Sequence, residues 1–85
     1  MPDIEIYTQP YCPYCMRAIA VLERKAASFT EISAPHGTPQ REEAIRRSGG
    51  LRSVPQIFIG GRHVGGCDDL LVLERAGELD ALLTP

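Results

Sequence analysis

Residues 4–22 read IEIYTQPYCPYCMRAIAVL, and within this stretch an alternating pattern gives way to a helical one. Apolar and polar residues alternate over residues 4–8 and stop at a Gln-Pro pair, which predicts a first strand and its exit loop. From Pro13 onward the apolar residues recur at helical spacing, which predicts a helix that ends near Ala27. Cys12 is therefore expected where the loop ends and the helix begins.

The rest of the chain continues the alternation of strands and helices. The predicted elements are a strand over residues 29–32, a helix capped by Thr38 and closed by Ser48-Gly49-Gly50, a hairpin of residues 54–59 and 62–66 around Gly60-Gly61, and a helix over residues 67–83. This order predicts an α/β fold in which a small mixed sheet is flanked by helices. At 85 residues, we expect one domain spanning residues 1–85.

Composition excludes several classes of protein. Nine basic and eleven acidic residues give a net charge of −2, which provides no basic field for nucleic acid. The chain has neither an export signal at its start nor the roughly 18 consecutive apolar residues of a membrane span. Its three cysteines are fewer than a secreted disulfide scaffold uses. We therefore expect a cytoplasmic protein that binds neither nucleic acid nor membrane.

The pair Cys12 and Cys15 has the arrangement of a working thiol couple. A cysteine at a helix start faces unpaired backbone N–H groups, and these favour the thiolate. Cys15 lies one turn further along the same face, close enough to form a disulfide with Cys12. The sequence thus predicts that Cys12 attacks a substrate disulfide and that Cys15 resolves the product.

Two other uses of this pair are less favoured. A permanent disulfide would close a ring of only a few residues and would restrain little of the unfolded chain. A zinc site needs four ligands, and only Cys67 with His36 or His63 could complete it, without a second paired motif. We therefore predict no metal site. A CxxC pair that follows a strand and opens a helix is typical of thiol-disulfide chemistry.

Three motifs in order, CPYC at residues 12–15, VPQIFI at 54–59 and GGCDDL at 65–70, make this chain resemble the glutaredoxin family in its dithiol form. The chain is similar to small bacterial glutaredoxins over nearly all of its length. The resemblance implies a thioredoxin-like fold with a four-stranded sheet. It also implies glutathione-dependent reduction of protein disulfides and glutathionylated proteins. Thioredoxins typically carry a tryptophan beside their cysteines, and this chain has none.

The resemblance also implies where glutathione binds. Val54-Pro55 would be a cis peptide whose Val54 backbone pairs with the cysteine of glutathione, with Ser53 beside it. Backbone N–H groups at the helix start near Cys67 would hold the γ-glutamyl carboxylate. The carboxylates of Asp68 and Asp69 would meet the ammonium group.

The other end of glutathione carries the glycine carboxylate, for which the resemblance implies Gln9 and Arg41, with Arg52 as a further candidate. Gln9 stands where relatives commonly have lysine. Tyr14 would pack beside the reactive sulfur. A remaining group of residues, Tyr7, Met16, Ala44 and Ile45, is expected in the core, and both histidines are expected on the surface.

Glutathione is expected as a co-substrate, with no permanently bound cofactor, and a monomer is expected. Two alternatives stay open. A dimer could hold an iron-sulfur cluster through Cys12 and glutathione, although Pro13 argues against it, because cluster-binding relatives usually have a more open residue there. A thioredoxin-like reductase fed by a flavoprotein is disfavoured by the GGCDD stretch.

Overall fold

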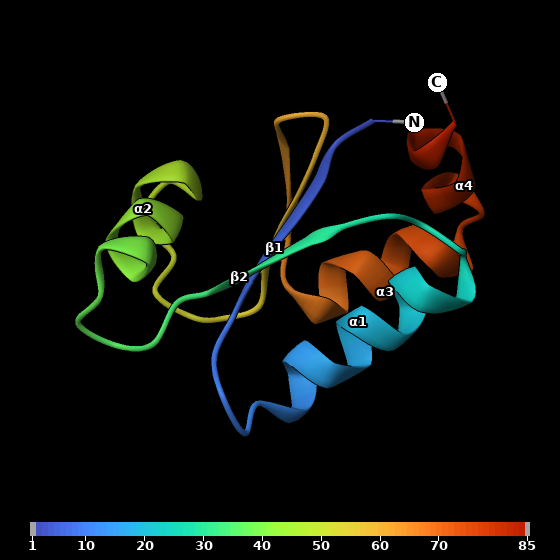
Figure 1. Cartoon of the computed structure of the whole chain (residues 1–85). Helices are drawn as coiled ribbons and strands as arrows, with labels where there is room; N and C mark the ends of the chain where they lie inside the picture. Colours follow the sequence, from blue (N-terminus) through green and yellow to red (C-terminus); the bar gives the residue numbers. More distant parts are fainter. Residues whose placement is uncertain (1, 85) are drawn as a thin grey trace.

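A computed structural model describes residues 2–84 and contains four strands and four helices. In chain order they are β1 (Ile4–Thr8), α1 (Pro13–Arg24), β2 (Thr30–Ser33), α2 (Pro39–Arg47), β3 (Gln56–Ile59), β4 (Arg62–Gly65), α3 (Cys67–Arg75) and α4 (Glu78–Leu83). The sheet order is β2-β1-β3-β4, with β1 parallel to β2 and the other pairs antiparallel. The predicted four-stranded mixed sheet is confirmed (Figure 1).

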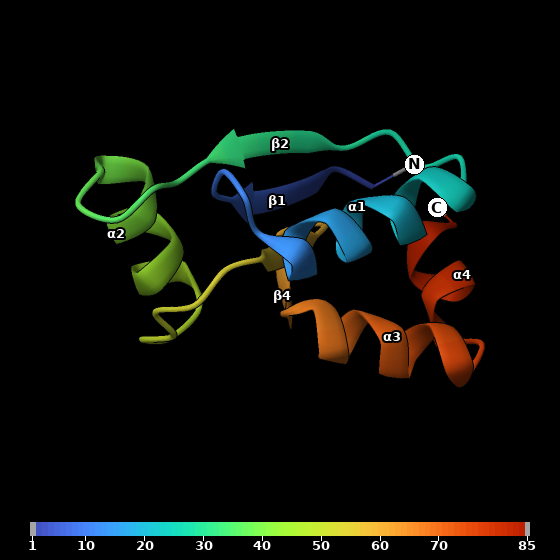
Figure 2. The ribbon, with the colours of Figure 1, turned by 90° about the horizontal axis from the view of Figure 1, so that it is seen from below.

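Alternation along the two central strands builds a core on each face of the sheet. Ile6 and Ile57 are directly paired and belong to the larger core, which includes residues of α1, α3 and α4. Tyr7 and Phe58 belong to a smaller core with Ala44 of α2. Successive residues of a strand point to opposite faces, so α2 covers the face that α1 and α3 leave free. Figures 1 and 2 show α2 well apart from these two helices.

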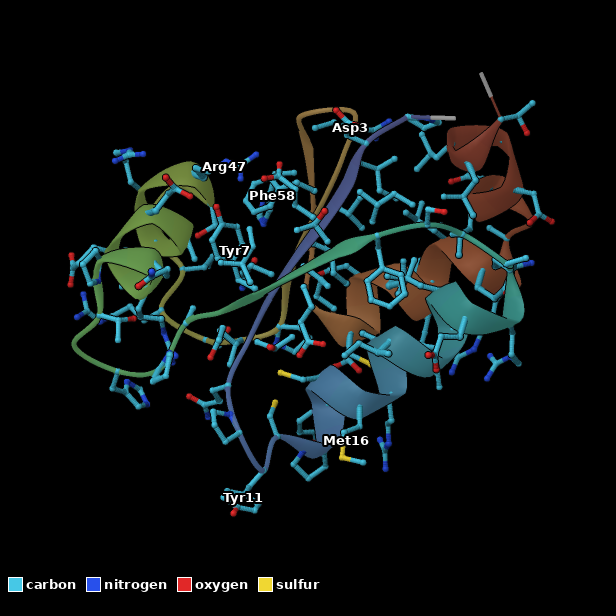
Figure 3. The ribbon with its side chains drawn as sticks, viewed as in Figure 1. Asp3, Tyr7, Tyr11, Met16, Arg47 and Phe58 are labelled. Carbon is cyan, nitrogen blue, oxygen red and sulfur yellow. The ribbon has the colours of Figure 1, made fainter. Side chains whose placement is uncertain are left out.

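A polar cluster connects α2 to the sheet. Arg47 donates from Nη1 to the Tyr7 hydroxyl at 2.7 Å and from Nη2 to Glu5 Oε1 at 2.9 Å. The Tyr7 hydroxyl in turn donates to the Glu43 carboxylate. The Arg47 guanidinium also lies 4.1 Å from the centre of the Phe58 ring, an arrangement in which a cation is attracted to the ring face. Figure 3 shows Arg47, Tyr7 and Phe58 gathered between α2 and β1.

Glycines set two chain reversals. Gly60 and Gly61 have φ values of 59° and 80°, the pair of positive angles that a tight two-residue hairpin requires, so the predicted turn is confirmed. Gly77 has a φ of 73° and interrupts the helix that the sequence predicts over residues 67–83. That prediction is wrong, because α3 ends at Arg75 and α4 begins at Glu78. A left-handed glycine is a common way to end a helix.

Lys25, at the end of α1, holds the two C-terminal helices together. Its Nζ lies 2.7 Å from Glu74 of α3 and 2.9 Å from Asp80 of α4. The break at Gly77 therefore leaves both helices tied to the same cation. Within residues 2–84, none of the helices is both long and apolar enough to span a bilayer.

Candidate active site

Cys12 is the residue that caps α1. Its Sγ accepts a hydrogen bond from the Cys15 backbone N–H at 3.2 Å, and Pro13 occupies the first helical position. The same sulfur lies 3.9 Å from the Val54 carbonyl oxygen. Only 7% of Cys12 is exposed. The predicted position at the helix start is confirmed, and the sulfur is held between the helix N-terminus and the loop before β3.

Cys15 lies one helical turn deeper and is buried. Burial, followed by a hydrogen bond with the Cys12 side chain, raises the pKa of Cys15 to about 12. Cys15 is therefore a neutral thiol near pH 7 and can donate to Cys12, which leaves Cys12 as the sulfur that meets substrate. This asymmetry fits a pair in which one thiol attacks and the other resolves.

A pocket of about 280 Å³ adjoins the cysteine pair. The predicted cis bond at Val54-Pro55 is present, and both residues line this pocket. The remaining lining residues are Tyr14, Leu51, Ser53, Gln56, Gly66, Cys67, Asp68 and Asp69. Seven of the predicted glutathione-binding residues are thus brought together, from the start of α1, the loop before β3 and the start of α3. Leu51 and Gln56 line the same pocket and were assigned no role from the sequence, whereas Gly66 belongs to the GGCDDL motif at residues 65–70.

The two acids of the pocket differ in their surroundings. Asp69 Oδ2 accepts a hydrogen bond from the Gly66 backbone N–H at 2.9 Å. Gly65 has a φ of 123°, and a Cβ there would lie 2.3 Å from Asp69 Oδ2, so glycine allows this close approach. Asp68 is exposed, and within residues 2–84 its carboxylate has no hydrogen bond or ion pair.

Gln9 and Arg41 lie together but do not line the pocket. Arg41 is only 4% exposed, so it is not a solvated charge on α2. It donates from Nη1 to the Ala34 carbonyl at 2.7 Å and to Gln9 Oε1 at 3.0 Å, and from Nε to the Arg52 carbonyl at 3.1 Å. The guanidinium thus connects the three loops that follow β1, follow β2 and precede β3.

Gln56 is the buried polar residue of the site. Its Nε2 donates to the Ser53 carbonyl at 3.0 Å, and its Oε1 lies 2.7 Å from His63 Nε2. His63 is therefore a half-buried partner of Gln56 and not the surface residue that the sequence predicts. The available signal for Gln56 was a single polar residue within the otherwise apolar stretch VPQIFI at residues 54–59. Arg41 and Gln56 together hold the consecutive carbonyls of residues 52 and 53.

Cys67 begins α3 and is 4% exposed. Its side chain belongs to the larger core. Burial, with a smaller contribution from the charge of Asp68, raises the pKa of the Cys67 thiol. Cys67 therefore contributes to the pocket mainly through its backbone at the start of α3, and less through its sulfur.

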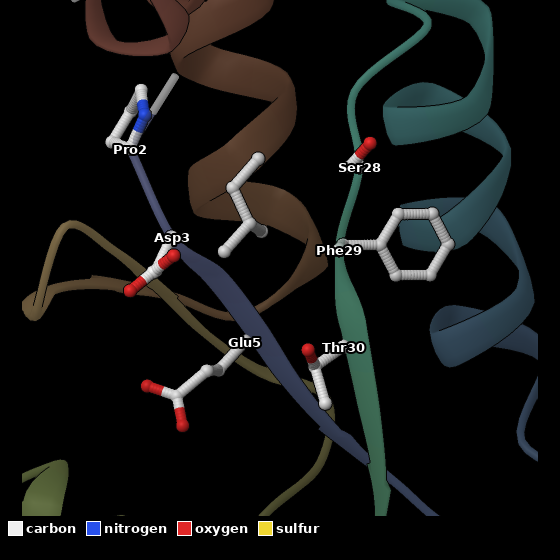
Figure 4. Close-up of a pocket in the computed structure, with 7 residues that line it drawn as sticks. Pro2, Asp3, Glu5, Ser28, Phe29 and Thr30 are labelled. Carbon is white, nitrogen blue, oxygen red and sulfur yellow. The ribbon is translucent and has the colours of Figure 1, made fainter.

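A larger hollow, of about 640 Å³, lies near the opposite end of β1. It is lined by Pro2, Asp3, Ile4, Glu5, Ser28, Phe29 and Thr30 (Figure 4). None of these lining residues is a cysteine, a histidine, a lysine or an arginine. The chemistry of the molecule is therefore concentrated in the smaller pocket beside Cys12.

Known proteins resemble this chain along nearly its full length. The Glutaredoxin family model matches residues 4–64. A glutaredoxin from Pseudomonas aeruginosa is 54% identical over 84 residues, which are 99% of this chain and 99% of that protein. The solution structure of glutaredoxin from Brucella melitensis has a TM-score of 0.84 and 58% identity, and the match covers 98% of this chain and 89% of that chain.

A structure of a glutaredoxin with its ligand is also similar. The crystal structure of the buckwheat glutaredoxin-glutathione complex has a TM-score of 0.85 and 28% identity, with 96% of this chain and 76% of that chain covered. The Cys12–Cys15 pair at the start of α1, next to a cis-proline loop, has the arrangement that thiol-disulfide exchange needs. The chain belongs to the glutaredoxin family and is a glutathione-dependent thiol-disulfide oxidoreductase.

Proposed function

We propose that this protein reduces glutathionylated proteins and protein disulfides in the cytoplasm, as a monomer that uses glutathione as co-substrate and holds no permanent cofactor. The observation that carries the proposal is the position of Cys12. Its sulfur sits at a helix start, against the Val54 carbonyl and beside a pocket of about 280 Å³. That pocket offers backbone groups, one free carboxylate and an aromatic side chain to a small peptide.

Glutathione would lie in the pocket in an extended form. The Val54 backbone would pair with its cysteine as an added strand does, with Ser53 and Pro55 beside it and Tyr14 packed against its backbone. N–H groups at the start of α3, from Cys67 onward, would bind the γ-glutamyl carboxylate. Asp68 would bind the ammonium group, because Asp69 is already engaged with Gly66.

The glycine carboxylate would lie on the side of Gln9 and Arg41. Most donors of Arg41 are used within the protein, so its contribution is a positive charge and a fixed position for the surrounding loops. Gln9 would contribute an amide donor, since its Oε1 is occupied by Arg41. Arg52, which is exposed, would be available as a second cation.

The reaction would proceed by two thiol exchanges. Cys12 thiolate attacks the glutathionyl sulfur of a mixed disulfide, forms a bond to it and releases the protein thiolate, which takes up a proton. A second glutathione thiolate then attacks this new disulfide, releases oxidised glutathione and restores Cys12. For a protein disulfide, Cys12 thiolate bonds to one of its sulfurs and releases the other as a thiolate. Cys15 then attacks the Cys12 sulfur of this mixed disulfide, loses its proton and releases the second protein thiolate. Two glutathione molecules reduce the resulting Cys12–Cys15 disulfide and leave as oxidised glutathione.

The test is reduction of a small glutathionylated substrate, coupled to glutathione, with single cysteine variants. Cys12→Ser should abolish turnover of every substrate, because it removes the attacking sulfur. Cys15→Ser should still reduce glutathionylated cysteine, since glutathione resolves that intermediate, but should lose most reduction of a protein disulfide. The proposal fails if Cys12→Ser retains turnover or if Cys15→Ser stops both reactions.

A further inference from the structure

Tyr11 is an unusual residue to find immediately before the nucleophile. Its side chain is 100% exposed, although it is large and aromatic. Its backbone has a φ of 58°, in the left-handed region that bulky residues rarely adopt. A ring that is fully exposed packs against nothing in the fold, so packing does not offset this conformation. Residues in sparsely populated backbone conformations cluster at active sites and ligand-binding sites.

Met16 is a second apolar side chain left in solvent at this end of α1. The sequence predicts it in the core, but 68% of it is exposed, which makes that prediction wrong. The Met16 N–H donates to the Cys12 carbonyl at 3.1 Å, so the two residues are neighbours on one face of the helix. Helical side chains lean towards the N-terminus, and Met16 therefore leans over the turn that holds Cys12. Figure 3 shows Tyr11 and Met16 both projecting away from the sheet at this end.

The glutathione pocket does not account for either residue. Tyr14 lines that pocket, whereas Tyr11 and Met16 do not. Cys12 itself is only 7% exposed, so the polypeptide that carries a substrate sulfur must cover the surface around Cys12 before the sulfurs can meet. Among residues 2–84, Tyr11 precedes Cys12 in the chain and Met16 lies one turn after it, and both are exposed large apolar side chains that do not line the pocket.

We propose that Tyr11 and Met16 form a docking surface for the protein half of a glutathionylated substrate, and that it selects a large apolar side chain close in sequence to the modified cysteine. The proposal rests on the proposed function and adds a sequence preference to it. Tyrosine provides rigid apolar area at the tip of the loop, and methionine adapts to side chains of different shape. Burial of one apolar side chain between them would supply the preference.

The experiment compares two uncharged glutathionylated peptides that differ only in carrying Leu or Ser two residues before the cysteine, with glutathionylated cysteine as a third substrate. Wild type should have a kcat/KM about five- to tenfold higher for the Leu peptide. Tyr11→Gly and Met16→Gln should each reduce this ratio to about twofold or less, and Tyr11→Phe should keep it. Val72→Ser is the matched control, because it removes another exposed apolar side chain, from within α3, and should leave the ratio at the wild-type value.

Stability separates a role in docking from a role in the fold. Glycine adopts a φ of 58° readily, so Tyr11→Gly should unfold at the same temperature as wild type or higher. The docking proposal is overturned if wild type does not distinguish the peptides, if the ratio survives Tyr11→Gly, or if Tyr11→Gly lowers the unfolding temperature. It is also overturned if wild type is a dimer that Tyr11→Gly dissociates. Absence of wild-type turnover on glutathionylated cysteine would instead overturn the proposed function.

Discussion

Asp68 and Asp69 are adjacent carboxylates with different surroundings. Asp69 is held by the Gly66 N–H at the start of α3, where a carboxylate satisfies a free donor and interacts favourably with the helix dipole. Asp68 is exposed at the rim of the pocket. The two carboxylates have different surroundings because their side chains point in different directions. Two consecutive aspartates in a sequence do not reveal these directions.

We predict that substitution of these two acids by asparagine will separate binding from stability. Asp68→Asn should raise the KM for glutathionylated cysteine by about five- to tenfold, because it removes the charge that we propose pairs with the glutathione ammonium, and should leave the unfolding free energy almost unchanged. Asp69→Asn should lower the unfolding free energy by up to about 1 kcal/mol, because a neutral oxygen is a weaker cap. Steady-state kinetics and urea unfolding measure the two effects. Equal effects of both variants on KM would show that Asp69 also binds substrate.

At the residue scale, the sequence identifies functional residues that belong to short, continuous motifs. Cys12 and Cys15 are found where the sequence predicts them, and the cis bond at Val54-Pro55 is found where the resemblance to glutaredoxins implies it. Arg41 is different, because its partners at positions 9, 34 and 52 come from three separate loops. Only the folded chain shows that this arginine is buried. Gln56 was missed for the same reason, since Ser53 and His63 reach it through a turn and a neighbouring strand.

At the scale of elements, α2 depends on a few polar contacts for its position. Arg47 connects the helix to Glu5 and Tyr7 of β1 and lies over Phe58 of β3. Burial and the hydrogen bond to Glu43 raise the pKa of Tyr7, so its hydroxyl remains a donor across the physiological range. Since α2 also carries Arg41, the position of this helix affects the loops around Cys12.

We predict that Arg47→Met will lower the unfolding free energy by about 1–2 kcal/mol, because it removes two hydrogen bonds and a cation from the face of Phe58. Arg46→Met is the matched control on the same helix. Arg46 is largely exposed, and its one ion pair within the described part of the chain is with Glu43 at 3.8 Å, so the control should change stability by less than about 0.5 kcal/mol. Urea unfolding in the same buffer measures both. If the two variants are equally stable, Arg47 does not anchor α2.

The sequence predicts the existence of the elements better than their ends. The alternating pattern predicts β1 at the residues where it is found, although Tyr7 and Thr8 are both buried, because both faces of the sheet are covered by helices. The helix over residues 67–83 is predicted as one piece because apolar residues continue across Gly77. The structure divides it there, and a glycine in this setting was a signal for a helix end that the apolar pattern outweighed.

The whole molecule should lose stability in alkali. Burial raises the pKa of Cys15 to about 12 and also raises the pKa values of Cys67 and Tyr7, whose usual values are 9.0 and 10.0. The unfolded chain therefore releases these protons at lower pH than the folded chain does. Stability that is fully present below about pH 9 is then lost as the pH rises towards 12.

We predict that the unfolding free energy of the reduced protein, measured in urea with a phosphine reductant, will decrease steadily from pH 8.5 to pH 10.5 or above. Cys15→Ala should have a shallower decrease, because it removes the thiol with the raised pKa of about 12. Between pH 6.5 and 8 these groups should contribute almost no pH dependence to the unfolding free energy of either protein. A stability that is flat or rising above pH 9 would contradict the burial of these thiols.

The sulfur that reacts in this protein is also the acceptor at the start of α1. When Cys12 is bonded to another sulfur, it becomes a poorer acceptor for the Cys15 N–H. The free energy that α1 gains from the reduced sulfur then contributes equally to two measurable quantities, the stability of the reduced protein and the reduction potential of the cysteine pair. It makes reduced protein harder to unfold than oxidised protein, and it makes the couple more oxidising, as in other thiol oxidants whose reduced form is the stabilised one. Substitutions along α1, remote from any substrate, should therefore shift the reduction potential by an amount that unfolding measurements alone can forecast.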